Sequence, residues 1–352
     1  YCLQKLHRFP HEFIELPFKE KAFVIGFAAG DALGVPVEFA TRGQLQKQPI
    51  KEMIGYGNHW QVPGTWSDDT SLTIATIDSL VHGYDPEDIA KKFIEWFDNG
   101  KYSASGYVFD IGSTTRFAIL RAKYGDIPAI SCGGTGVHEN GNGSLMRILP
   151  LAFLLQSDED FEHRKKVIYD VSSITHAHIV SKIACHFLVE FAIKLLKNDA
   201  VDDAYKETRR IFSVYYKDVE EAECFLRIFN GVILNVPVNE IRSSGYVIDT
   251  LEAAVWCIFH TKTYKDAVLT AVNLGGDTDT IGAITGGLAG IIYGYKAIPQ
   301  KWEENLENKE LLYCAANQLQ VMGEDAERNA SCVYTAKQSF FARLFSKFWK
   351  NK

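Results

Sequence analysis

The amino-acid sequence predicts an all-α fold, and three observations support this prediction. Apolar residues recur at spacings of three and four residues through most of the chain, which is the period of an α-helix. Stretches in which apolar and polar residues strictly alternate, as expected of β-strands, are scarce. No linker rich in Pro, Ser or Gly divides the chain, so the helices are expected to form one body.

The helices expected in the first half of the chain begin at residues that favour helix initiation. The segment 67–70, Ser-Asp-Asp-Thr, runs directly into one of them, and Pro86 follows Asp85 as expected of a first-turn proline. Ser, Thr and Asp are favoured at helix starts because their side-chain oxygens accept free backbone N–H groups. The expected helices are Ala22–Leu33, Ser71–His82, Pro86–Phe97 and Ser113–Lys123.

A glycine-rich segment, residues 131–144, is expected to be a loop that leads into a short helix at 145–150. A loop of this kind lets bare N–H groups reach a phosphate. It lacks the Lys-Ser or Lys-Thr of a nucleotide P-loop, so a plain surface loop is the alternative. The helices expected after it are His178–Lys197, Val201–Tyr216, Glu220–Leu234, Tyr246–Thr261, Tyr264–Val272 and Ile281–Gly294.

Two of these helices carry a glycine at every fourth position, although each interior glycine destabilises a helix by about 1 kcal/mol relative to alanine. We interpret the pattern as close backbone approach of two deeply buried helices. If they pack on each other, Asp31, Glu38 and Asp277 would lie near one another. In the alternative, the glycines only make room for aromatic neighbours. They are Gly26, Gly30 and Gly34 in one helix and Gly282, Gly286, Gly290 and Gly294 in the other.

Composition and charge narrow the classes of function. The chain has 352 residues, a net charge of −7 and an isoelectric point near 5.8, which argues against an electrostatic nucleic-acid binder. The first residues lack the apolar region of a signal peptide, and no apolar run is long enough to span a bilayer. The seven cysteines show no disulfide pattern, and Cys185 and Cys257 fall on apolar helical faces. We expect a cytoplasmic protein with reduced thiols and no transmembrane segment.

The most informative feature for function is a pair of oxygen-rich clusters far apart in the chain. They are Ser67-Asp68-Asp69-Thr70 and Asp277-Thr278-Asp279-Thr280. Carboxylates that converge repel one another unless protons or cations neutralise them. Carboxylate and hydroxyl oxygens are ligands suited to magnesium or manganese. The alternative is helix capping, but a cap needs one oxygen and each cluster supplies more. We therefore predict a two-metal site and an enzyme.

Several stretches, taken in order, resemble the ADP-ribosylglycohydrolase family. They are GFAAGDALG at 26–34 with Glu38, GTWSDDT at 64–70, GNGSLMR at 141–147, Thr175-His176, GYV at 245–247 and GGDTDT at 275–280. Their order and spacing cover residues 21–299. The resemblance implies a single orthogonal helical bundle with a binuclear magnesium site, Mn²⁺ being the alternative ion.

The resemblance also implies roles for individual residues. One ion would be held by Ser67, Asp68 and Asp69, and the other by Asp277, Asp279 and Thr280. Asp69 and Asp279 would be catalytic, with Asp279 bridging the ions, and Glu38 matches a mobile acid that gates the site or transfers a proton. Residues expected to bind ADP-ribose are Asn142, Gly143, Ser144, Met146, His176, Tyr246, Gly275 and Gly276.

The implied function is removal of ADP-ribose from modified proteins, which reverses an ADP-ribosyltransferase. Such cleavage passes through an oxocarbenium-like sugar, metal ions can lower the pKa of a bound water, and a carboxylate can move the proton. Asp110 is placed like the acid that assists the guanidinium leaving group in arginine-directed relatives. With Tyr246 it favours an arginine linkage over a serine linkage. The alternative for Asp110 is a cap of the helix that starts near Ser113.

The two ends differ from the expected enzymatic domain, residues 21–325. Residues 1–20 form an aromatic extension with prolines, which packs on its own surface or reaches a partner. The alternative function uses this extension: an immunity or binding protein that occludes an ADP-ribosyltransferase toxin, with or without hydrolysis. Residues 326–352 form a basic amphipathic tail, which caps its own domain or binds a membrane surface or partner groove.

Overall fold

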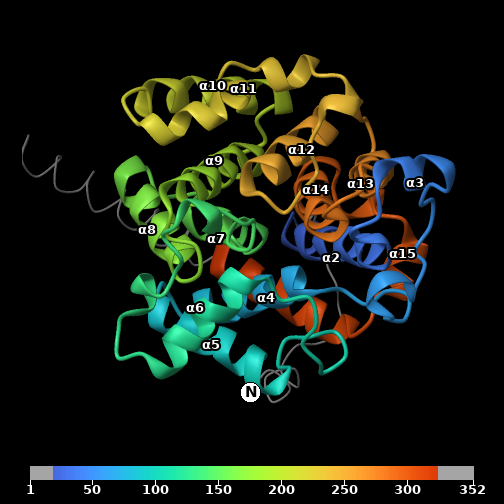
Figure 1. Ribbon diagram of the computed structural model, residues 1–352, viewed down its shortest axis with the longest axis horizontal. Coiled ribbons are helices and arrows are strands. Elements are labelled where there is room, and N and C mark those ends of the chain that lie inside the picture. The colour runs from blue at the N-terminus through green and yellow to red at the C-terminus, as the bar shows by residue number, and fades with distance from the viewer. Residues whose placement is uncertain (1–18, 324–352) are drawn as a thin grey trace, which may run out of the picture.

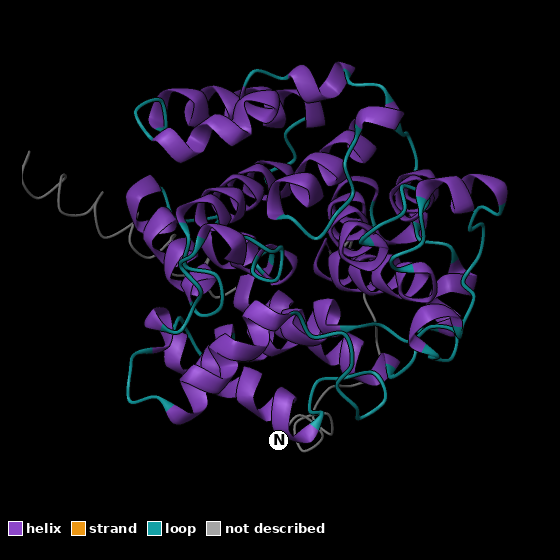
Figure 2. Ribbon diagram, in the orientation of Figure 1, coloured by secondary structure: helices purple, strands orange, loops and turns teal. Residues whose placement is uncertain are grey.

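The computed structural model describes residues 19–323, which form helices joined by loops (Figure 2). Within this range no residue belongs to a β-strand, apart from isolated bridges such as that between Gly141 and Tyr246. The prediction of an all-α fold is therefore confirmed. The predicted basic tail, residues 326–352, lies outside the described residues, and so do residues 1–18 of the predicted N-terminal extension.

The helices lie in three parts (Figure 1). Helices α10 and α11 lie along one edge and α4 to α6 along the opposite edge, with α2, α9 and α14 between them. The bounds are α2 (Lys19–Gly34), α3 (Arg42–Lys47), α4 (Asp68–Leu80), α5 (Pro86–Asn99), α6 (Ser113–Tyr124), α7 (Pro150–Leu155), α8 (Phe161–Ser173), α9 (Ile179–Leu196), α10 (Val201–Tyr215), α11 (Leu226–Phe229), α12 (Val247–His260), α13 (Tyr264–Val272), α14 (Thr278–Tyr293) and α15 (Gln300–Asn305). Residues 309–323 are also helical.

Helices α2 and α14 pack on each other through their glycines. A Cβ atom added at Gly30 would lie 2.0 Å from the carbonyl oxygen of Gly282, and one at Gly26 would lie 2.7 Å from that of Gly286. Only glycine permits such close backbone contact, so the alternative that the glycines only accommodate aromatic rings is wrong for these pairs. Gly294 departs from the pattern, because it ends α14 with a φ of 79° and has no neighbour within 4 Å of an added Cβ.

The predicted helix over residues 220–234 is wrong. The chain there forms a 3-10 helix at Glu220–Phe225, the short α11, and a second 3-10 helix at Val232–Asn235. Gly231 follows α11 with a φ of 72°, a left-handed conformation that a continuous right-handed helix cannot contain. The sequence did not predict α3, α7 and α15, which are too short to show a periodic pattern. It also did not predict α8 or the helix at residues 309–323.

Cys185 and Cys257 are buried free thiols, as predicted. Cys314 contradicts the expectation of reduced thiols, because it is disulfide-bonded. Among the helices described here, none has both the length and the apolar character that crossing a membrane requires.

Candidate active site

The two oxygen-rich clusters meet in the fold, at the start of α4 and the start of α14. Thr280 Oγ1 donates a hydrogen bond to Asp69 Oδ2 at 3.3 Å. Asp31, Asp69 and Asp279 each place a carboxylate oxygen within 4.8 Å of the other two. The glycine contacts bring them together, because α2 and α14 run antiparallel and the C-terminal end of α2 reaches the first turn of α14.

Capping accounts for only part of the first cluster. Asp31 Oδ1 accepts the Ser67 N–H at 2.9 Å, and Asp31 Oδ2 accepts the Thr70 N–H at 3.1 Å and its hydroxyl at 2.6 Å. Ser67 Oγ accepts the N–H of Asp69 at 3.3 Å. The start of α4 is therefore capped without the carboxylates of the cluster. Asp277, the N-cap residue of α14, makes no side-chain capping bond.

Three carboxylate oxygens in the site are buried without a hydrogen-bond partner: Asp69 Oδ1, Asp277 Oδ1 and Asp279 Oδ2. Leaving such an atom unpaired costs about 1–3 kcal/mol, and most buried polar atoms are paired. Oxygens of this kind are the ligands that divalent cations take. The donor set therefore fits a bound metal. A second group of oxygens, from Glu38, Asp277 and Asp279, shares Asp279 with the first group.

Burial raises the pKa of the carboxyl groups in the cluster, and their mutual repulsion adds to the effect. Burial raises the pKa of Asp31 to about 7 against the opposing effect of its hydrogen bonds. Burial, followed by the charges of Asp110 and Asp277, raises the pKa of Glu38 to about 10. A site of this kind binds protons or cations in preference to standing as bare anions. The pKa is also raised for Asp68, Asp69, Asp277 and Asp279.

We expect the stability of the cation-free protein to fall as the pH rises. A carboxyl whose pKa is higher in the folded than in the unfolded protein binds more protons when folded. Raising the pH between the two values therefore favours unfolding. The pKa of an unfolded carboxyl is about 4. The pH range over which stability falls therefore extends to about pH 7 for Asp31 and about pH 10 for Glu38. Calorimetry in chelator should show Tm falling from about pH 5 to about pH 8, and magnesium should reduce the fall. A rising Tm would contradict this.

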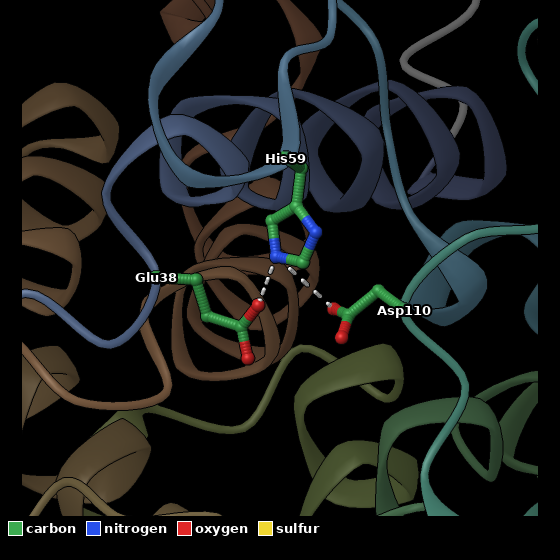
Figure 3. A group of neighbouring side chains, drawn as sticks. All are labelled: Glu38, His59 and Asp110. Atoms are coloured by element: carbon green, nitrogen blue, oxygen red, sulfur yellow. Dashed lines mark hydrogen bonds and ion pairs between the residues drawn. The ribbon is translucent and has the colours of Figure 1, made fainter.

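Glu38, His59 and Asp110 point toward one another (Figure 3). Glu38 also lies beside Asp277 and Asp279. His59 Nε2 forms a hydrogen bond with Glu38 Oε2 and lies 3.9 Å from Asp110 Oδ2. Asp110 is not a helix cap, because the N-cap of α6 is Gly112. His59 was not predicted as a site residue, because it is a lone histidine in an irregular segment and no ligand spacing marks it.

Two segments carry these side chains, residues 38–60 and residues 107–110. Both contain non-glycine residues with positive φ angles. The φ angles are 63° at Phe39, 67° at Tyr56, 55° at Trp60 and 53° at Asp110. Such conformations are rare for non-glycine residues and cost about 1–3 kcal/mol each. The backbone at Phe39 is held in part by a hydrogen bond from its N–H to the Gly276 carbonyl at 2.7 Å. Strain of this kind clusters at functional sites.

Two backbone donors in the first part of the glycine-rich segment are paired within the protein. The N–H groups of Gly133 and Gly134 donate to the carbonyls of Ser173 and Thr175 at 2.9 and 3.0 Å. These two donors are therefore not available to a phosphate. The second part of the segment, beginning at Asn140, contacts the acidic cluster through Asn142.

Asn142 links that second part to the cluster, because its Nδ2 donates to Asp277 Oδ2 at 3.0 Å. Gly143 packs against His176, and a Cβ added at Gly143 would lie 2.8 Å from the imidazole ring. Burial lowers the pKa of His176 to about 3, with a further contribution from Arg147, so the ring is neutral near pH 7.

The other residues expected to bind ADP-ribose lie around this point. The Ser144 hydroxyl is buried and accepts a hydrogen bond from Ser172 at 3.0 Å, so its side chain faces the core. Met146 is also buried. Tyr246 is partly exposed and precedes α12. Gly275 and Gly276, with φ angles of 75° and 77°, form the turn before Asp277.

Comparison with known proteins gives a consistent picture. A family model described as ADP-ribosylglycohydrolase matches residues 19–329. The chain is 33% identical to the ADP-ribosylarginine hydrolase Tri1 of Serratia proteamaculans, over 88% of this chain and 81% of that protein. It is 31% identical to the ADP-ribosyl-[dinitrogen reductase] glycohydrolase of Rhodospirillum rubrum, over 81% of this chain and 89% of the relative. A solved ADP-ribosylglycohydrolase-related protein complex superposes with a TM-score of 0.70 at 28% identity, covering 87% of this chain and 98% of the other.

Proposed function

Because the chain belongs to the ADP-ribosylglycohydrolase family and is a hydrolase of ADP-ribose linkages, we propose that it releases ADP-ribose from arginine side chains of modified proteins. The observation that carries the proposal is the group of carboxylates with buried, unpaired oxygens, next to the buried Glu38 and the partly exposed Asp110. The preference for arginine is supported by two relatives at 33% and 30% identity, each named as an ADP-ribosylarginine hydrolase.

We propose two magnesium ions as the cofactor, with Mn²⁺ as the alternative. Ser67, Asp68 and Asp69 would hold one ion, and Asp277, Asp279 and Thr280 the other. The unpaired oxygens of Asp69, Asp277 and Asp279 support this assignment. When bound, such ions orient ribose hydroxyls and lower the pKa of a bound water.

The protein side chains supply the remaining chemistry. In hydrolysis, the water oxygen bonds to the anomeric carbon, the bond from that carbon to the guanidine nitrogen breaks, and the nitrogen keeps the electron pair. One proton must leave the water and one must reach the leaving group. Glu38 and Asp110 are linked through His59 beside the site, and we assign them this proton transfer.

ADP-ribose would bind along the second part of the glycine-rich segment. The bond from Asn142 to Asp277 and the contact of Gly143 with His176 support a pyrophosphate position beside the cluster. Ser144 and Met146 would contribute through their backbone, since their side chains are buried. Tyr246 would pack on the sugar or the leaving group, and Gly275 and Gly276 would shape the same side of the site.

The proposed partners are an ADP-ribosylated protein and the ADP-ribosyltransferase that modified it, and a cytoplasmic location stays a prediction. The alternative of an occluding immunity protein also stays a prediction, because residues 1–18 lie outside the described part of the chain. Deleting residues 1–20 should abolish occlusion and preserve hydrolysis, whereas Asp279→Ala should do the reverse.

The direct test is release of ADP-ribose from arginine-linked and serine-linked substrates, with and without chelator. We expect cleavage of the arginine linkage and its loss in chelator. Asp110→Asn should reduce arginine cleavage by about 100-fold or more, the usual contribution of a positioned acid or base. Turnover that persists in chelator would contradict the metal assignment, and a preference for serine linkages would contradict the linkage.

A further inference from the structure

Four large aromatic side chains lie exposed in the two segments that carry Glu38, His59 and Asp110. We call them the aromatic rim. They are Phe39, Tyr56, Trp60 and Tyr107, with exposed fractions of 67%, 56%, 80% and 76%. Exposed apolar residues scattered singly need no explanation, but a group bordering one site marks an interaction surface.

The rim adjoins the acids of the site. Phe39 directly follows Glu38, and its ring centroid lies 6.1 Å from that of His59. Trp60 directly follows His59 in the chain. The ring of Phe109, the neighbour of Asp110, also packs against His59, with the two ring centroids 5.4 Å apart. Aromatic rings therefore lie on two sides of His59, which itself contacts Glu38 and lies near Asp110.

Folding alone does not account for the rim. Phe39, Tyr56 and Trp60 combine a left-handed backbone with an exposed aromatic side chain. Each feature is unfavourable for the isolated protein, because the backbone is strained and the ring remains in water. These exposed rings add little to the burial of apolar surface in the folded chain, and a partner that covered them would bury that surface.

We propose that the aromatic rim is the docking surface for the polypeptide that carries the modified arginine. The inference rests on the proposed function. Charge complementarity selects this occupant, because the guanidinium is cationic and the acids at the centre of the rim are Glu38 and Asp110. Aromatic side chains are enriched at protein interfaces, where they pack on the apolar surface of the partner. Glu38 and Asp110 receive the linkage, and the rim binds the peptide on either side of it.

The test compares two substrates that share one scissile bond: free ADP-ribosylarginine and a protein modified on arginine. The variants are Trp60→Ala, Tyr107→Ala and the double variant. For the modified protein we expect KM to rise by about tenfold in the double variant with kcat unchanged, the effect of losing central aromatic contacts. For free ADP-ribosylarginine both constants should stay at the wild-type values.

Tyr124→Ala is the matched control, because Tyr124 is equally exposed, at 74%, but lies at the end of α6 outside both segments. Trp60→Asn guards against misfolding: asparagine tolerates the left-handed backbone, so it should keep or raise Tm while still raising KM for the protein substrate. Equal losses on both substrates, or no loss on either, would overturn the docking surface. So would a change in oligomeric state alone, which would make the rim a contact between copies. If the wild type cleaves neither substrate, the proposed function itself fails, and this inference with it.

Discussion

Asp69→Asn is expected to reduce hydrolysis by at least about 100-fold while making the cation-free protein more stable. Replacing a residue that only supports a metal ligand already reduces activity by about 10–100-fold. Asp69 is placed to be a direct ligand, so its replacement should cost at least as much. Asp69 Oδ1 is buried without a partner, and its other oxygen meets Thr280. The amide keeps the shape of the side chain but supplies one oxygen and no charge.

The gain in stability has a separate physical reason. Burial and neighbouring carboxylates raise the pKa of Asp69, so above the pKa of the unfolded chain this carboxyl opposes folding. Asparagine does not ionise, and the variant should be more stable than the wild type by at least about 1 kcal/mol in chelator at about pH 8. Denaturant titrations in chelator and in magnesium measure the free energy of unfolding of the cation-free and the magnesium-bound protein. The stabilising effect of magnesium, present in the wild type, should be lost in the variant.

Glu190→Gln is the matched control, because Glu190 is equally buried but pairs with Arg164, Oε1 to Nε, at 2.6 Å. Weakening a buried ion pair destabilises a protein, so this variant should lose at least about 1 kcal/mol and keep its response to magnesium. If Asp69→Asn behaved like Glu190→Gln, with lower stability in chelator and normal turnover, Asp69 would be an ordinary structural acid.

The parts of the fold that follow a regular period could be predicted from the sequence. Apolar spacing predicted most of the long helices, although not α8 or the helix at residues 309–323. The four-residue spacing of glycines predicted the contact between α2 and α14, which brings the acidic clusters together. The helix over residues 220–234 could not be predicted correctly, because apolar spacing does not reveal that Gly231 turns left-handed.

Local spacing also could not reveal how single residues from irregular segments join the site. His59 reaches Glu38 and Asp110 only because the backbone around it adopts conformations that bulky residues rarely take. Asp31 was expected near the site, but its hydrogen bonds to the start of α4 depend on how α2 and α4 pack on each other. The contacts of His59 and Asp31 join residues that are far apart in the sequence, so residue spacing along the chain cannot predict them.

Gly34→Ala is expected to reduce stability and cation binding together. Gly34 has φ and ψ angles of −80° and −38°, which alanine adopts readily, so any effect must come from contact and not from backbone strain. A Cβ at Gly34 would lie 2.3 Å from the backbone nitrogen of Asp279. Because that neighbour is backbone, the first turn of α14 must move. Overpacking of this kind costs about 1–3 kcal/mol, and sometimes more.

The displacement falls on Asp279, which the two groups of carboxylates share, so the site should be damaged with the fold. Gly43→Ala is the matched control: an added Cβ there meets nothing within 4 Å, and Gly43 lies in α3. Alanine in a helix should make that variant more stable by about 0.5–1 kcal/mol. Titrating magnesium while following Tm separates the two variants. Since α2 and α14 carry the acids on their adjoining ends, a Gly34→Ala protein that kept wild-type stability and wild-type magnesium affinity would mean that the glycine contact does not position the site.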